Sequence, residues 1–189
     1  MRDRRDPRSL DIAALCREGE SLSGRVELAQ LDRLAGSLFG PAGAAGASAA
    51  VAWSAQASLK PVPGGEPERW LHLQAQAEVV LQCQRCLEAL RQPLAVDRNY
   101  LFVQHEQAAE RLDEELEDDV MALPPRLDLI DLIEDELILA LPIVPRHEGD
   151  CPQPLPLPAP AEVDEPAPNP FAKLAGLRRT PPRDDPEVD

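Results

Sequence analysis

The chain has 189 residues, a length typical of one domain with flanking segments. Hydrophobic residues make up 43% of it, which is enough for a core, although only 3% of the residues are aromatic. The formal net charge of −15 disfavours broad binding to nucleic acid, because affinity for a phosphate backbone comes largely from lysine and arginine. An acidic surface instead attracts basic proteins.

Most of this charge lies in one stretch of the sequence. Residues 104–136 carry 13 acidic side chains against Arg111 and Arg126, a net charge of −11. Residues 1–103 carry 12 acidic and 12 basic side chains and are neutral as a whole. The sequence therefore predicts an acidic block beside a neutral body.

The sequence also indicates a compartment. No stretch approaches the roughly 20 apolar residues of a membrane span, and the charged N-terminus is not followed by an apolar signal segment. Four cysteines are too few for a disulfide scaffold in a chain of this length. We therefore expect a cytoplasmic protein in a reducing setting, with no membrane partner.

Short elements are expected before the central sheet. Residues 1–20 are polar and charged, and they predict a flexible N-terminus with a turn of helix. Ser21–Leu28 alternates apolar and polar side chains, which is the pattern of a half-buried strand. The leucines from Leu28 to Leu38 then change to helical spacing.

Three runs in the middle of the chain predict an antiparallel sheet. Val51–Leu59 and Trp70–Val79 alternate in the same way and are separated by a turn rich in proline and glycine, which is typical of a hairpin. Leu94–Val103 predicts a further strand.

A helix is expected after the acidic stretch. Residues 105–119 predict a solvated loop or a frayed helix, as like charges repel. Leu127–Leu141 places its apolar residues at i, i+3, i+4 and i+7, and Pro142 ends the pattern. Together the elements predict an α+β domain over residues 21–150, in which this helix packs on an antiparallel sheet that is either open or barrel-like.

The C-terminal residues 151–189 are rich in proline and predict a disordered tail of polyproline character. Within this tail, residues 169–177 place Phe171, Leu174 and Leu177 at i, i+3 and i+6, on one face of a short helix. An apolar face on a flexible tether predicts a motif that docks on a partner.

Cys83-Gln-Arg-Cys86 is the feature that points most directly to chemistry. Two thiolates at this spacing can reach one zinc ion, and His147 and Cys151 can complete a set of four ligands. Structural thiols at a strand end are the alternative, and both interpretations stay open. A redox pair is disfavoured because such pairs usually open a helix in a βαβ unit. No motif of a hydrolase or of a phosphate-binding loop is present, which argues against an enzyme.

A small arginine patch offers an alternative function. Single-strand binders combine basic grooves with aromatic side chains that stack on bases. Arg85, Arg91 and Arg98 lie near Tyr100 and Phe102 and can form such an RNA-binding patch. Pairing of the arginines with acidic neighbours competes with this interpretation.

Several motifs occur together in an order that resembles a known family. Cys83-Gln-Arg-Cys-Leu-Glu88 precedes a strand that ends in Tyr100-Leu-Phe-Val103, and an acidic loop follows. After the loop come Asp128-Leu-Ile-Asp-Leu-Ile-Glu-Asp-Glu-Leu-Ile-Leu-Ala-Leu-Pro142 and, in the tail, Asn169-Pro-Phe-Ala-Lys-Leu174. This order is similar to that of the large ribosomal RNA subunit accumulation proteins, the YceD-like family, from Ser21 to Leu177.

The resemblance implies a non-enzymatic role in the synthesis, processing or stability of large-subunit (23S) ribosomal RNA. It implies no catalytic residue. This sequence differs from some members of the family, which have a second cysteine pair, because only Cys151 represents that pair here. The expected partners are ribosomal proteins or assembly factors of the large subunit. The side chains predicted to bind them are acidic residues of the block and apolar residues of the tail motif: Asp113, Glu114, Glu115, Glu117, Asp118, Asp119, Phe171, Leu174 and Leu177.

Overall fold

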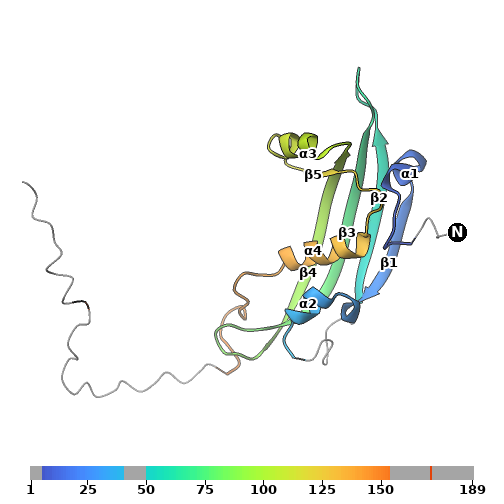
Figure 1. Ribbon diagram of the computed structural model, residues 1–189. Coiled ribbons are helices and arrows are strands. Elements are labelled where there is room, and N and C mark those ends of the chain that lie inside the picture. The colour runs from blue at the N-terminus through green and yellow to red at the C-terminus, as the bar shows by residue number, and fades with distance from the viewer. Residues whose placement is uncertain (1–5, 41–49, 154–170, 172–189) are drawn as a thin grey trace, which may run out of the picture. The chain divides into compact units, whose positions relative to one another are not determined.

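The computed structural model describes residues 6–40, residues 50–153 and Phe171 (Figure 1). Its central element is a five-stranded sheet in the order β1-β2-β3-β4-β5. The strands are β1 (Ser21–Glu27), β2 (Ala50–Lys60), β3 (Glu68–Gln82), β4 (Ala89–Val103) and β5 (Asp119–Ala122). The helices are α1 (Ile12–Glu18), the short 3-10 helix η1 (Leu28–Gln30), α2 (Asp32–Gly36), α3 (Glu106–Asp113) and α4 (Leu129–Leu139).

The chain divides into two units, Met1–Pro154 and Leu155–Asp189. All the helices and strands above belong to the first unit. Of the second unit only Phe171 is described, and 68% of its surface is exposed. Apart from Phe171, residues 154–189 lie outside the described residues, Leu174 and Leu177 among them, so the docking motif stays a prediction.

The predicted α+β class is confirmed, and the sheet is open. Strands β1 to β4 pair in antiparallel fashion. Along β2, the buried residues Val51, Trp53, Ala55 and Ala57 alternate with more exposed ones, as the period of two predicts. The barrel-like alternative is not adopted, because β1 and β5 are the two edges of the described sheet and do not pair with each other.

The last strand was not predicted, and it pairs differently from the others. β5 runs parallel to β4, with Tyr100 opposite Asp119 and Val103 opposite Ala122. Residues 104–118, which include α3, carry the chain from the end of β4 back to the level of Tyr100. β5 therefore runs in the same direction as β4. The acidic stretch thus contains a helix and leads into an edge strand.

One face of the sheet carries the core. α4 crosses this face beside β4, α1 packs on β2 and β3, and α2 packs on α4 (Figure 1). The largest fully buried side chains come from these elements, from η1 and from the residues just before α1 and α2: Leu10, Ile12, Leu28, Leu31, Leu34, Leu71, Leu73, Tyr100, Phe102, Leu129, Ile133 and Leu137. No helix in the described part of the chain is long and apolar enough to cross a membrane.

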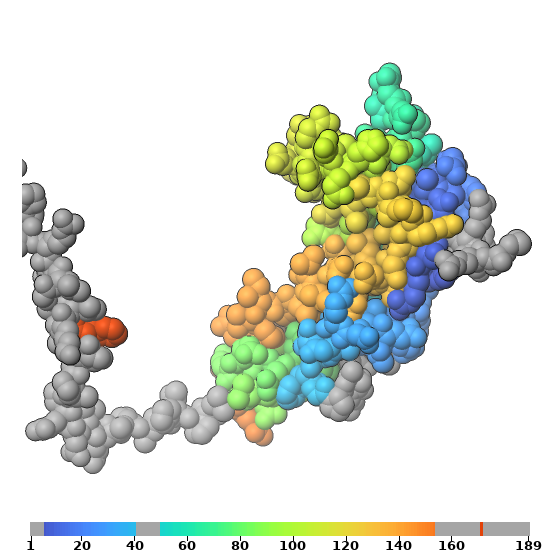
Figure 2. Space-filling model, in the orientation of Figure 1, coloured from blue at the N-terminus to red at the C-terminus, as the bar shows by residue number. Residues whose placement is uncertain are grey.

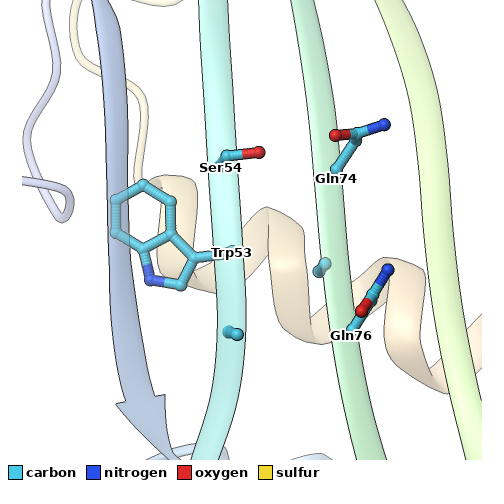
Figure 3. Close-up of a pocket in the computed structure, with 6 residues that line it drawn as sticks. Trp53, Ser54, Gln74 and Gln76 are labelled. Atoms are coloured by element: carbon cyan, nitrogen blue, oxygen red, sulfur yellow. The ribbon is translucent and has the colours of Figure 1, made fainter.

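The opposite face of the sheet is polar. A shallow hollow of about 230 Å³ lies on this face, and Figure 3 shows residues that line it, with α4 behind the strands. Ser54, Gln74 and Gln76 line it, and these side chains are neutral. The hollow therefore offers hydrogen-bonding groups but no charged side chain and no histidine or cysteine.

Residues 10–16 contribute to the core, whereas the sequence predicts a flexible stretch with one turn of helix over residues 1–20. The backbone groups of Leu10 and Leu127 exchange two hydrogen bonds of 2.9 Å each, and Leu10 is fully buried. The Asp11 carboxylate accepts a hydrogen bond of 3.0 Å from the N–H of Ala14 and so caps α1. The predicted helix over Leu127–Leu141 is α4, and Asp128 caps it in the same way.

Candidate functional site

The cysteine pair lies in the loop that joins β3 to β4. This loop is a tight turn, in which the N–H of Leu87 donates to the carbonyl of Cys83 (2.8 Å) and the N–H of Cys83 donates to the carbonyl of Glu88 (2.9 Å). Leu87 has a φ of 63°, a left-handed value that residues other than glycine rarely adopt. The turn places Cys83 and Cys86 side by side, and both are buried.

The segment after α4 reaches this loop (Figure 1). The N–H of Gln84 donates to the carbonyl of Pro145 (2.8 Å). The guanidinium of Arg85 donates to the carbonyl of Gly149. These two contacts bring residues 147–151 against the cysteine pair, although more than 60 positions separate them along the chain.

Four side chains at this junction fit a tetrahedral zinc site. One ligand atom from each of Cys83, Cys86, His147 and Cys151 lies within 4.8 Å of the other three. The sulfur atoms of Cys83 and Cys151 are 3.8 Å apart, and Cys86 Sγ is 3.5 Å from His147 Nδ1. Zn–S bonds of about 2.3 Å and Zn–N bonds of about 2.0 Å require separations of about 3.8 Å and about 3.5 Å in a tetrahedron. The structure thus brings together the four residues predicted as zinc ligands.

His147 and Cys83 have the surroundings of metal ligands. His147 Nε2 lies 3.2 Å from the carbonyl of Ala89, which can only accept a hydrogen bond, so in the neutral imidazole the proton lies on Nε2 and the Nδ1 lone pair faces Cys86. Burial raises the pKa of Cys83, but backbone N–H groups, first those of Arg85 and His147, outweigh it and hold the pKa below its usual value. A thiolate, the form that binds metal, is therefore favoured at Cys83.

Arg85 is part of this cluster, a role that the sequence did not predict. Its Nε donates to the sulfur of Cys151 over 2.9 Å. Three thiolates and a divalent ion carry a net charge of about −1, which an adjacent guanidinium neutralises. Three cysteines and one histidine also complete a tetrahedron, so the set suits a structural zinc and leaves no open position for a substrate.

The acidic residues of α4 hold the fold together. Glu134 is buried, and its Oε1 accepts hydrogen bonds from the backbone N–H groups of Arg33 (2.7 Å) and Leu34 (3.0 Å) at the start of α2. Its Oε2 accepts from the Arg33 guanidinium (3.0 Å), which also contacts Asp131 and Asp135. Sequence reasoning missed this cluster, since 101 positions separate Arg33 from Glu134.

The acidic residues predicted to bind partners divide into two kinds. Asp113 accepts a hydrogen bond from the N–H of Val120 (3.2 Å), and Asp118 accepts one from the side chain of Asn99 (3.3 Å). Asp119 is the half-buried first residue of β5. Three others are exposed and form no ion pair within the residues that the structure describes: Glu114, Glu115 and Glu117.

The arginine patch of the alternative function is not assembled. Arg91 pairs with Glu78 (2.9 Å), and Arg98 with Glu136 (3.4 Å). Tyr100 and Phe102 are 2% and 1% exposed, so their rings belong to the core. A ring inside the core cannot stack on a base.

Comparison with known families identifies the chain. The family described as large ribosomal RNA subunit accumulation protein YceD matches residues 71–178, which is more than half of the sequence. The chain belongs to the YceD family. The matched range of this YceD member contains the four candidate zinc ligands, α3 and α4, whereas residues 21–70, where the resemblance was also predicted, lie outside it.

A curated YceD protein gives the same result. The large ribosomal RNA subunit accumulation protein YceD of Haemophilus influenzae is 38% identical to the chain over 108 residues. The alignment covers 55% of this chain and 62% of the relative, which is less than two thirds of the relative's length. No solved structure was found to match the chain.

Proposed function

We propose that this YceD member supports the synthesis, processing or stability of 23S ribosomal RNA in the cytoplasm, without catalysing a reaction. It acts through contacts with ribosomal proteins or assembly factors of the large subunit. The names of the family and of the Haemophilus influenzae relative concern large-subunit ribosomal RNA and support this role.

One observation supports contact with proteins over contact with RNA. The exposed carboxylates of Glu114, Glu115 and Glu117 follow α3 and have no cationic partner among the described residues. They repel a phosphate backbone and attract the basic surface of a ribosomal protein. The arginines considered for RNA binding are already engaged by acidic residues or by Cys151.

Complementation tests this proposal. A strain that lacks the protein receives either the wild-type chain or a variant in which Glu114, Glu115 and Glu117 are replaced by glutamine. We expect this variant to restore less 23S ribosomal RNA and fewer large subunits than the wild type, as measured by gradient sedimentation. A matched variant changes three other exposed acids, Glu27, Glu66 and Glu88, and is expected to restore both fully. Equal restoration by the two variants would contradict the proposed acidic contact.

We further propose that Cys83, Cys86, His147 and Cys151 bind one zinc ion with a structural role. Bound zinc would tie the segment after α4 to the hairpin loop, and the separations of the ligand atoms support it. Elemental analysis of the protein purified without added metal is expected to give one zinc per chain. A protein that is folded and contains no zinc would contradict the proposal.

A further inference from the structure

A groove lies between the end of α3, strand β5 and the C-terminal half of α4, in the region between α3 and α4 in Figure 2. It has a volume of about 460 Å³. Met121, Leu132 and Ile138 are among the apolar residues that line it. Its acidic lining consists of Asp113, Asp119, Asp135 and Glu136. A groove that combines apolar walls with carboxylates suits a side chain with an apolar stem and a cationic end.

The groove is lined by more carboxylates than there are cationic side chains beside it. Arg98 pairs with Glu136 at 3.4 Å, and Arg33 pairs with Asp135. Asp119 has neither an ion pair nor a side-chain hydrogen bond in the described part of the chain. Burial raises the pKa of Asp119, Arg98 opposes this, and the neighbouring carboxylate of Glu136 adds to it. Four carboxylates against two guanidinium groups leave the groove with a net negative charge.

The buried hydroxyl oxygen of Tyr100 belongs to a residue that lines the same groove. Tyr100 lines the groove and is only 2% exposed. Its hydroxyl lies near Glu136 but forms no hydrogen bond of ordinary geometry with any described residue. Buried hydroxyl groups normally have a partner, because an unsatisfied one costs about 1–3 kcal/mol. A ligand with hydrogen-bond donors would satisfy both the hydroxyl and the carboxylates.

Apolar surface is exposed at the rim of the groove. Leu139 lines the groove and is 73% exposed. An occupant that carries only charge would leave this surface uncovered, whereas an amphipathic basic segment would cover it.

We propose that this groove binds a basic side chain, with its apolar neighbours, from an amphipathic segment of a protein partner. The inference rests on the proposed function, because it names the site at which a basic ribosomal protein or assembly factor docks. The cation enters among Asp113, Asp119 and Glu136, and apolar residues of the partner cover Leu139.

Binding of synthetic peptides to the full chain tests this site. The probe is an amphipathic helical peptide built of leucine and arginine, and its control replaces each arginine by citrulline, which has nearly the same shape and no charge. We expect the citrulline peptide to bind at least about tenfold more weakly, because it cannot pair with the carboxylates. Equal binding of the two peptides, or displacement of the arginine peptide by micromolar calcium, would overturn the inference.

Two protein variants locate the binding site. Asp119→Asn removes a groove carboxylate, and Leu139→Ser removes exposed apolar surface; each is expected to weaken binding of the arginine peptide by about tenfold. The matched controls are Glu88→Gln, in the loop just before β4, and Ile143→Ser, which is 99% exposed; both residues lie outside the groove. Wild-type binding by both groove variants, with melting temperatures unchanged, would overturn the inference.

The failure of this inference is distinguishable from the failure of the proposed function. If the groove variants bind the peptide as the wild type does, the groove is not the site, whatever the cellular result. If they lose peptide binding, and deletion of the whole protein leaves 23S ribosomal RNA unchanged, the groove is a binding site and the proposed function is wrong.

Discussion

At the scale of single residues, Gly24 is constrained by an aromatic ring. Gly24 lies opposite Trp53 in the register of β1 and β2, and a Cβ atom at Gly24 would lie 2.8 Å from Cζ2 of the indole. We expect Gly24→Ala to lower the free energy of unfolding by about 1–3 kcal/mol, because the buried ring must shift. Gly36→Ala is the control, since no atom lies within 4 Å of its Cβ. Urea denaturation of both variants measures the difference, and equal stability would contradict the packing described here.

Glu134 provides a second prediction at this scale. Glu134→Gln leaves backbone N–H groups of α2 and the Arg33 guanidinium poorly satisfied, and we expect a loss of about 2–4 kcal/mol in the free energy of unfolding. Asp135 contacts the same arginine from a half-exposed position. We therefore expect Asp135→Asn to lower the free energy of unfolding by about 1 kcal/mol or less. Similar losses in the two variants would show that burial of the Glu134 carboxylate is unimportant.

The effect of Glu134 should also depend on pH. Burial raises its pKa, but hydrogen bonds from Leu34 and Arg33 outweigh this and hold the pKa below the usual 4.5. The stability that the carboxylate contributes is therefore present above pH 4.5 and is lost as the pH falls through its folded value. The difference between wild type and Glu134→Gln should shrink below pH 4.5 in denaturation curves. A difference that stays constant to low pH would contradict the assigned contacts.

The residues that the sequence identified best are those with distinctive chemistry. The four candidate zinc ligands could be named because cysteine and histidine are few and their spacing is informative. The roles of Arg33 and Arg85 could not be named, because any of many arginines can serve as a partner across long separations. Burial of Tyr100 and Phe102 also escaped the pattern, since the same aromatic residues suit a core or a stacking surface.

At the scale of elements, the cysteine cluster joins the hairpin loop to the segment after α4. We expect Cys151→Ala to abolish zinc binding and to open residues 142–153 to proteolysis, because the ligand that anchors this segment is lost. Cys16→Ala is the control, since Cys16 is buried away from the cluster, in α1. Limited proteolysis with mass spectrometry measures the opening. Equal protection of the segment in both variants would contradict a structural role for the cluster.

Elements with a long, regular pattern could be predicted, and short ones could not. The long strands β2, β3 and β4 and the helix α4 have enough residues for their periods of 2 and 3.6 to stand out. β5 has four residues, at the end of a run of acids, and the sequence gives no signal that it pairs in parallel. α1 has seven residues, and its packing depends on the backbone contact of Leu10 with Leu127, which is distant in sequence.

At the scale of the whole molecule, the acidic side chains fall into two groups. The carboxylates of α4 are engaged in the fold through Arg33 and Arg98. The glutamates that follow α3 are exposed and remain available to a basic partner. The sum of −11 over residues 104–136 therefore overstates the charge offered to a partner, a distinction that requires the structure.

Affinity purification of the full chain from growing cells, with and without nuclease, tests the central claim most directly. Quantitative mass spectrometry identifies the proteins that are recovered, and sequencing identifies the RNA. We predict that ribosomal proteins or assembly factors of the large subunit are recovered in both samples, because the proposed function has the chain contact proteins through its acidic surface. Recovery of these components only when RNA is intact would contradict the claim and favour direct RNA binding, and recovery of no ribosomal component would contradict the proposed function as a whole.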